Sequence, residues 1–239
     1  MGEIERAHSL EGRWDILYRD YPEVYEEFGR IPKSPDFLEV ICERFPIDGK
    51  VVVDVGSGTG ISTFDLAQHA REVIGIEPEP SMIALAIENA RERGIQNVRL
   101  QASDAEHLPL EDNSVDAAFG VTLAGGDVAT VAAEMERVVR QGGLVLRGDV
   151  APGWYGGDLN PVITGQPRNE VAPPGSRDDV LERLGHEALD VWMDQEDGSV
   201  ERLARTYGFI HSARAIEHVR KHGITSIRWK MRVLFKWVE

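Results

Sequence analysis

The stretch KVVVDVGSGTG, residues 50–60, places three consecutive valines shortly before a turn with three glycines in five residues. A short, continuously apolar run of β-branched residues is typical of a strand that is buried on both faces of a parallel sheet. The glycines of the turn, 56–60, allow a tight bend and leave bare backbone at the end of the strand. The stretch therefore predicts a central strand followed by a ligand-binding glycine turn.

Strand-like and helix-like segments alternate on the carboxyl side of this stretch. The expected strands are 72–77, 97–103, 114–122 and 144–150, and the expected helices are 61–70, 80–94 and 127–143. Such alternation predicts parallel strands joined by right-handed crossovers, with helices on both faces of the sheet. Because ligands bind outside the carboxyl ends of these strands, the functional residues are expected in the turns that follow them.

The whole chain is expected to form an α/β fold with a doubly wound, mostly parallel, seven-stranded sheet. Residues 1–46 predict helices with breaks at Pro22 and 31–35, and residues 47–150 predict the ligand-binding core. Residues 151–206 predict a lid or cap, which starts as a Gly- and Pro-rich loop, 151–175, and continues in helices over 176–208. Residues 207–239 predict two long strands, 209–219 and 224–238, that complete the sheet.

Composition argues against several classes of partner and location. The net charge of −15, from 41 acidic and 26 basic residues, disfavours nucleic acid and anionic membrane as partners. The single cysteine, Cys42, allows no internal disulfide and is expected to be a buried thiol. The first residues are charged and lack an apolar signal region, and no apolar run approaches the length of a membrane span. We therefore expect a cytoplasmic protein.

The spacing of the glycines separates two classes of cofactor site. The dinucleotide fingerprint is G-x-G-x-x-G, whereas here the pattern is G-x-G-x-G and Ile61 stands at the place of the last glycine. A nucleotide-cofactor oxidoreductase, which would need a glycine at 61 or 62, stays open as an alternative. The helix expected after the turn would direct its positive end at a carboxylate or phosphate.

Two carboxylates follow the next strands at positions suited to a nucleoside. Glu77 ends the strand 72–77 and can accept hydrogen bonds from both hydroxyls of a ribose. Asp104 follows the strand 97–103 and can accept from the exocyclic amine of adenine, while Ala105 donates its backbone N–H to a ring nitrogen. A plain helix or turn cap is the alternative role for Asp104.

These motifs resemble, in order and spacing over residues 45–150, the class I (Rossmann-like) S-adenosylmethionine-dependent methyltransferases of the type that acts on small molecules. VVVDVGSGTG resembles the first motif of that family, IGIEPEPSMIALA the second, ASDAEHLPLEDNSVDAAFG the adenine-side motif and EMERVVRQGGLVLRGDV the segment around the fifth strand. The resemblance implies S-adenosyl-L-methionine as cofactor. The cofactor-binding residues that it implies are Asp54, Gly56, Ser57, Gly58, Gly60, Glu77, Pro78, Met82, Asp104, Ala105, Gly120 and Val121.

Methyl transfer from a sulfonium needs chiefly alignment and exclusion of water, so the sequence needs no dedicated catalytic motif. Candidates for a catalytic group are Tyr18, Tyr155 and His186, each with a structural role as the alternative. Trp154, Trp192, Tyr21 and Tyr25 are further candidates for contact with a small-molecule acceptor. Asp149 is a possible single metal ligand without a second one, so no metal is expected. A monomer or homodimer is expected, and a non-catalytic, methyltransferase-like binding subunit stays open.

Overall fold

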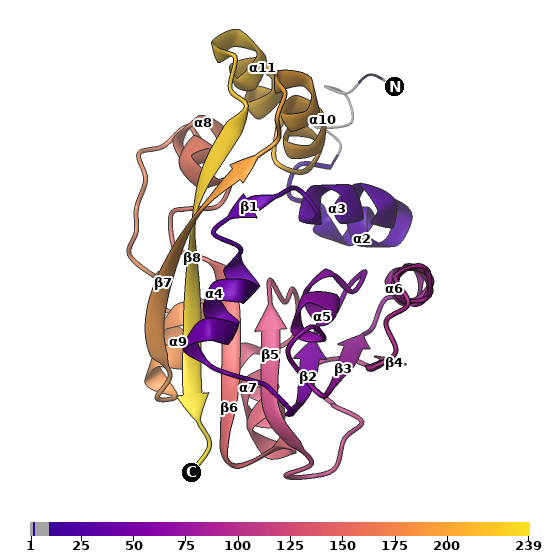
Figure 1. Ribbon diagram of the computed structural model, residues 1–239. Coiled ribbons are helices and arrows are strands. Elements are labelled where there is room, and N and C mark those ends of the chain that lie inside the picture. Colours follow the sequence, from indigo (N-terminus) through magenta and orange to yellow (C-terminus); the bar gives the residue numbers. More distant parts are fainter. Residues whose placement is uncertain (1, 3–9) are drawn as a thin grey trace. The chain divides into compact units, whose positions relative to one another are not determined.

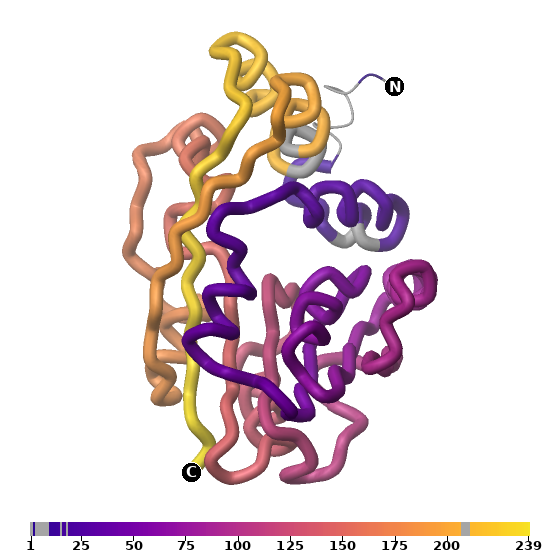
Figure 2. Tube along the Cα trace, viewed as in Figure 1, coloured from indigo at the N-terminus to yellow at the C-terminus, as the bar shows by residue number. Residues whose placement is uncertain are grey.

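The structure of the protein, a computed structural model, describes residue 2 and residues 10–239, apart from the side chains of 15, 18 and 207–210 (Figure 2). The chain divides into two compact units. The sheet unit comprises Leu38–Asp149, Ala172–Val191 and Arg232–Glu239. The helix-rich unit comprises Met1–Phe37, Val150–Val171 and Trp192–Met231.

Neighbouring parallel strands make up most of the sheet in the sheet unit, with β4 at one edge (Figure 1). They are β2 (Val51–Val55), β3 (Glu72–Glu77), β4 (Val98–Ala102), β5 (Val115–Val121) and β6 (Val139–Val150). The strand order in this unit is β7-β8-β6-β5-β2-β3-β4, with β7 (Glu187–Glu196) and β8 (Ser226–Trp237) at one side. The valines of β2 therefore lie in the middle of the sheet, as their continuous apolar run predicts.

The helices of the sheet unit include the three that were predicted between parallel strands, at 61–70, 80–94 and 127–143. They are α4 (Phe37–Arg44), α5 (Ile61–Leu66), α6 (Pro80–Glu92), α7 (Val128–Val138) and α9 (Arg177–Arg183). Asp127 caps α7 by accepting the backbone N–H of Thr130 through its side chain. Val131, Met135 and Val138 of α7 then pack in one buried cluster with strand residues such as Val53 and Ile74. This packing fixes the carboxyl ends of the strands as one edge of a rigid sheet.

The helix expected over 127–143 ends earlier than its glycines indicate. Helix α7 stops at Val138 and strand β6 begins at Val139, so Gly142 and Gly143 lie inside the strand. A Cβ on Gly143 would lie 2.5 Å from the backbone oxygen of Asp116. Gly143 thus serves a close approach of two strands, whereas Gly142 has a left-handed φ of 76° with open space around it. Sequence alone does not distinguish this use of glycine from a helix stop.

The helix-rich unit contains α2 (Trp14–Asp20), α3 (Pro22–Gly29), the 3-10 helix η1 (Gly157–Leu159), α8 (Asn160–Thr164), α10 (Val200–Ile210) and α11 (Ala213–His222). Its two-residue strand β1 (Lys33–Ser34) pairs antiparallel with β7, so the order in this unit is β1-β7-β8. The described residues therefore form eight strands, where seven were expected. The segment 151–175 is likewise more regular than a loop, since it holds η1 and α8.

The C-terminal expectation was wrong in two places. Residues 187–196, expected to be helical, form β7, in which the buried residues Val191, Met193 and Gln195 alternate as in a strand. Residues 209–219, expected to be a strand, belong mostly to helices. Ser212 caps α11 by accepting the backbone N–H of Ala215, and Gly223, with φ 65°, ends that helix.

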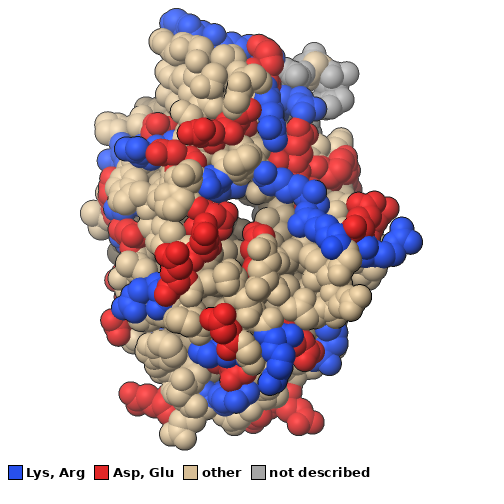
Figure 3. Space-filling view, in the orientation of Figure 1, with Lys and Arg blue, Asp and Glu red and all other residues tan. Residues whose placement is uncertain are grey.

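The surface carries both signs of charge in each unit, and Figure 3 shows blue and red side chains interspersed. On β8 the basic residues pair with carboxylates: Arg228 with Asp194, and Lys230 with Glu170. No helix in the described part of the chain has the length and apolarity that a membrane crossing requires.

Candidate functional site

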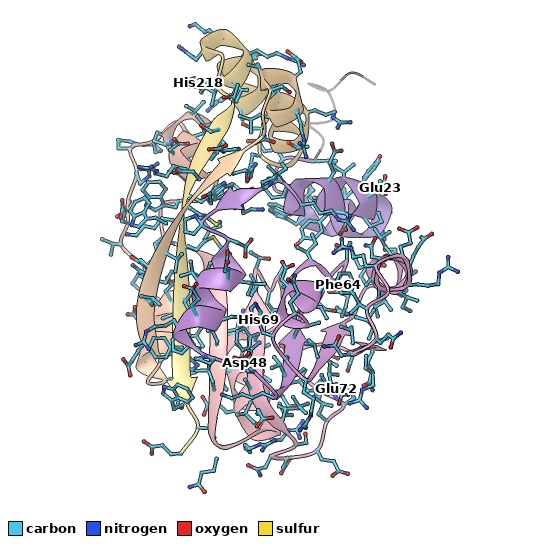
Figure 4. All side chains as sticks on the ribbon, in the orientation of Figure 1. Glu23, Asp48, Phe64, His69, Glu72 and His218 are labelled. Atoms are coloured by element: carbon cyan, nitrogen blue, oxygen red, sulfur yellow. The ribbon has the colours of Figure 1, made fainter. Side chains whose placement is uncertain are left out.

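The glycine turn follows β2 in the sheet unit, and its three glycines have left-handed backbone angles. The φ angles are 77° at Gly56, 54° at Gly58 and 90° at Gly60, a region that residues with a Cβ rarely adopt. A Cβ on Gly56 would lie 2.5 Å from Cδ1 of Leu123. A Cβ on Gly60 would overlap the ring of Phe64, which Figure 4 labels on α5. Packing as well as conformation therefore requires glycine at 56 and 60.

Glu77 holds the glycine turn from the neighbouring strand. Its Oε2 accepts the backbone N–H of Gly58 at 3.0 Å, and its Oε1 accepts the backbone N–H of Glu79 at 2.9 Å. Burial raises the pKa of the half-buried Glu77 carboxyl, although the two backbone hydrogen bonds oppose this shift. Each carboxylate oxygen has a second lone pair, so the carboxylate can still accept from the two hydroxyls of a ribose.

Asp54 is fully buried in β2 and links that strand to α5. Its Oδ2 accepts from the hydroxyls of Ser62 at 2.7 Å and Thr63 at 2.6 Å. Burial raises the pKa of Asp54, against these two hydrogen bonds. Its Oδ1 is buried and has no hydrogen-bond partner among the described residues. An orphaned carboxylate oxygen beside the glycine turn fits a cationic ligand group, such as the ammonium of S-adenosylmethionine.

Asp104 forms a turn cap, which was the alternative role for this residue in the sequence analysis. Its Oδ1 accepts the backbone N–H of Glu106 at 2.9 Å and lies 3.2 Å from Nδ1 of His107. The side chain is exposed, whereas Ala105 is half-buried and packs against the core cluster of the sheet. Both hydrogen bonds use Oδ1, so the cap is compatible with the adenine contact, which stays a prediction.

The other implied cofactor residues differ in exposure. Met82 is buried in α6 and Pro78 is exposed just before that helix. Ser57 is buried, donates its backbone N–H to Ile76, and has no described partner for Oγ. Gly120 and Val121 end β5, one strand away from β2. The structure thus brings Asp54, the glycine turn, Glu77, Gly120 and Val121 to the same edge of the sheet.

The sequence analysis missed residues on β5 and β6. Thr122 follows β5 with φ 51°, which is unusual for a β-branched residue, and its N–H donates to the carbonyl of Gly148 at 2.7 Å. The next residue, Leu123, places its side chain against Gly56. Arg147 is buried beside Gly120. The available signal was a charged residue inside the otherwise apolar run LVLRG.

Of the catalytic candidates, His186 lies in the sheet unit and Tyr155 in the helix-rich unit. His186 is buried at the start of β7, which β8, β6 and β5 separate from β2, and burial lowers its pKa. Tyr155, in the helix-rich unit, packs in a T-shaped arrangement on His211, with 4.8 Å between the ring centroids, and burial raises its pKa. The side chain of Tyr18 lies outside the described residues.

Trp154 has a packing role in the helix-rich unit. Its indole is buried under the guanidinium of Arg168, 3.5 Å from the ring centroid, and meets Trp192 edge-on at 4.8 Å. This environment explains the residue without a ligand. Cys42 is a buried free thiol in α4, as predicted. The described residues contain no group of three or more His, Cys, Asp or Glu side chains arranged to hold a metal ion.

Comparisons with known proteins find similarity to methyltransferases. Residues 47–164 match the family described as "Methyltransferase domain". The chain is 34% identical over 97 residues to the uncharacterized methyltransferase YcgJ of Bacillus subtilis, covering 40% of this chain and 38% of YcgJ. It is 35% identical over 145 residues to the demethylmenaquinone methyltransferase of Geobacillus, covering 54% and 61% of the two chains. The matches thus span less than two thirds of either relative.

Solved structures extend the similarity to the fold. The crystal structure of YcgJ aligns with a TM-score of 0.58 at 19% identity, covering 83% of this chain and 95% of YcgJ. The geranyl diphosphate C-methyltransferase of Streptomyces coelicolor, solved with S-adenosyl-L-homocysteine, aligns with a TM-score of 0.54 at 16% identity, covering 84% and 76%. Residues 47–164, just under half of the chain, therefore match the methyltransferase-domain family, and the chain has the fold of these solved structures.

Proposed function

We propose that the sheet unit binds S-adenosyl-L-methionine at the glycine turn and that the protein transfers the methyl group to a small-molecule acceptor. The observation that carries this proposal is the hydrogen bond from Gly58 to Glu77, which fixes a carboxylate beside bare backbone. The buried Oδ1 of Asp54, without a described partner, supports a cationic group on the ligand.

The proposed binding mode uses residues from four strand ends, those of β2, β3, β4 and β5. Asp54 faces the ammonium of the methionine moiety, and the backbone of 56–60 lies along that moiety. Glu77 accepts from the ribose hydroxyls, while Asp104 and Ala105 contact the adenine. Gly120 and Val121 pass beside the methionine end. The cofactor supplies an activated methyl group on its sulfonium, and the chain binds and orients it and excludes water from the acceptor.

Calorimetric titration tests the cofactor half of the proposal directly. We expect S-adenosylmethionine and S-adenosylhomocysteine to bind, and NADH not to bind. Gly58→Val should abolish binding in a folded protein, because a side chain at a φ of 54° enters the space of the ligand. Gly94→Val is the matched control, since Gly94 has a φ of 66° with open space around it.

Methyl transfer itself is tested with labelled methyl donor and a panel of small acceptors. Binding of NADH in place of S-adenosylmethionine would favour the oxidoreductase alternative. Cofactor binding without turnover of any acceptor would favour a non-catalytic subunit. A cytoplasmic location and a monomer or homodimer belong to the same proposal, and fractionation and analytical ultracentrifugation test them.

A further inference from the structure

Arg147 lies on β6 in the sheet unit. Strand β6 runs directly beside β5 (Figure 1). Arg147 pairs in register with Gly120, and its side chain is only 4% exposed. A Cβ on Gly120 would lie 2.9 Å from Cδ and 3.2 Å from Nε of Arg147. The side chain therefore crosses β5 through the space that the missing Cβ leaves, at a residue of the proposed cofactor site.

The guanidinium of Arg147 is buried without an ion-pair partner among the described residues. Its Nη2 reaches the carbonyl of Leu123 only at 3.5 Å, and its Nη1 has no described hydrogen-bond partner. Of the nearby carboxylates, Asp149 pairs with Arg177 at 2.5 Å, and Asp178 also pairs with Arg177. Burial, with the charge of Arg177, lowers the pKa of Arg147 to about 10. An unpaired buried cation is costly, so a ligand is the natural reason to keep it.

The surroundings of Arg147 connect it to the glycine turn. Leu123, whose carbonyl faces Nη2, packs its side chain against Gly56. Between Leu123 and β5 lies Thr122, whose left-handed φ of 51° is a strained conformation of the kind that collects at ligand sites. Leu123 thus contacts both Arg147 and the glycine turn.

We propose that Arg147 binds a carboxylate group of the methyl acceptor. The planar guanidinium fork matches a carboxylate in two parallel hydrogen bonds. Asp149 and Asp178 lie in the same neighbourhood and would repel a dianionic phosphate more strongly than a monoanion. This inference rests on the proposed function, because it places the acceptor beside the methionine end of the cofactor.

The test uses the full chain loaded with S-adenosylhomocysteine, and acetate as the probe with acetamide as its neutral control. The readout is the Nε–Hε resonance of Arg147 in nitrogen-15-labelled protein, assigned by its loss in Arg147→Lys. We expect acetate to shift this resonance saturably and acetamide to leave it unchanged. No saturable shift with acetate, or equal shifts with both compounds, overturns the proposal.

Stability separates binding from a structural role. Arg147→Met should unfold at the same or a higher temperature than wild type, and should lose the thermal protection that acetate gives relative to chloride. Arg140→Met, on the exposed part of the same strand, is the matched control and should keep that protection. A large drop in the melting temperature of Arg147→Met, with acetate protection retained in Arg147→Lys, would show a structural residue. Failure of S-adenosylhomocysteine to bind wild type would instead contradict the proposed function itself.

Discussion

The Oε2 atom of Glu77 lies 3.0 Å from the backbone nitrogen of Gly58, so the end of β3 holds the turn that follows β2. Two strands that are neighbours in space thus share one ligand site. The same carboxylate also accepts from Glu79 at the start of α6. Its removal is therefore expected to act on both the turn and the cofactor.

Glu77→Ala should weaken binding of S-adenosylmethionine by about 1–3 kcal/mol, the usual scale for hydrogen bonds to a charged group. Calorimetry measures the affinity, and circular dichroism checks that the variant is folded. The matched control is Glu72→Ala at the opposite end of β3, which should leave the affinity unchanged. An unchanged affinity in folded Glu77→Ala would remove this residue from the site.

The pH dependence of cofactor binding should carry the signature of Glu77. Because burial raises its pKa above 4.5, the carboxylate begins to take up a proton at a higher pH than an exposed glutamate. Affinity for S-adenosylmethionine should therefore fall as pH decreases through this raised pKa. Calorimetry across this pH range checks it, and Glu77→Gln should flatten this part of the profile.

Folding stability should respond to Glu77 in the opposite direction. The folded state has the higher pKa, so it binds more protons than the unfolded state between the two pKa values. The contribution of Glu77 to the free energy of unfolding consequently falls as pH rises through this interval. Denaturant titrations of wild type and Glu77→Gln without cofactor measure it. A contribution that increased with pH would contradict the raised pKa.

Gly56→Ala should destabilise the fold more than Gly94→Ala. Both glycines have a left-handed φ, but only at Gly56 would the new methyl group meet Leu123. We expect a loss of about 1–3 kcal/mol from strain at Gly56, with the overlap adding to it. Urea unfolding gives the comparison. In the double variant Gly56→Ala/Leu123→Ala the loss in free energy of unfolding should be smaller than the sum of the losses in the two single variants, because the overlap is relieved. A loss equal to that sum would argue against the contact.

Trp154→Ala should unfold the helix-rich unit more readily, by about 3–5 kcal/mol, because it removes a buried indole. Trp192→Ala is the control on the same aromatic pair. Because Trp192 is 48% exposed, this substitution should lower the free energy of unfolding less. Limited proteolysis of 151–175, with and without S-adenosylhomocysteine, addresses the predicted lid. If cleavage is equally fast with and without S-adenosylhomocysteine, and Trp154→Ala leaves turnover unchanged, the lid prediction fails and Trp154 has only a packing role.

Local sequence patterns predicted most of the fold and the edge of the sheet at which the cofactor residues lie. The strand before the glycine turn, the tight turn itself and the place of Glu77 at the end of the next strand depend on neighbours in sequence, and the structure agrees with each of these predictions. The role of Glu77 at a ribose stays a prediction. The secondary structure of the C-terminal third was harder to predict from the sequence. The segment 187–196 contains residues that favour a helix. Its buried and exposed residues nevertheless alternate, and only its pairing in a sheet explains this alternation. The strand expected at 209–219 was wrong because the capping role of Ser212 was overlooked.

The candidate site shows the same division. Asp54 and Glu77 follow from strand ends, whereas the environments of Trp154 and Arg147 depend on residues distant in sequence. Arg168 covers Trp154, and the room for Arg147 comes from Gly120 on the neighbouring strand. Contacts between residues that lie this far apart in the chain leave no pattern in a single sequence.

The contact between Arg147 and Gly120 also constrains how this chain can diverge. Any side chain at position 120 would enter the volume that Cδ and Nε of Arg147 occupy, so the two positions cannot change independently. Arginine on the sixth strand should accompany glycine on the fifth across an alignment of relatives, and a larger residue at one should coincide with a shorter one at the other. The pair is a covariation marker by which relatives sharing this buried cation can be sorted from those that lack it.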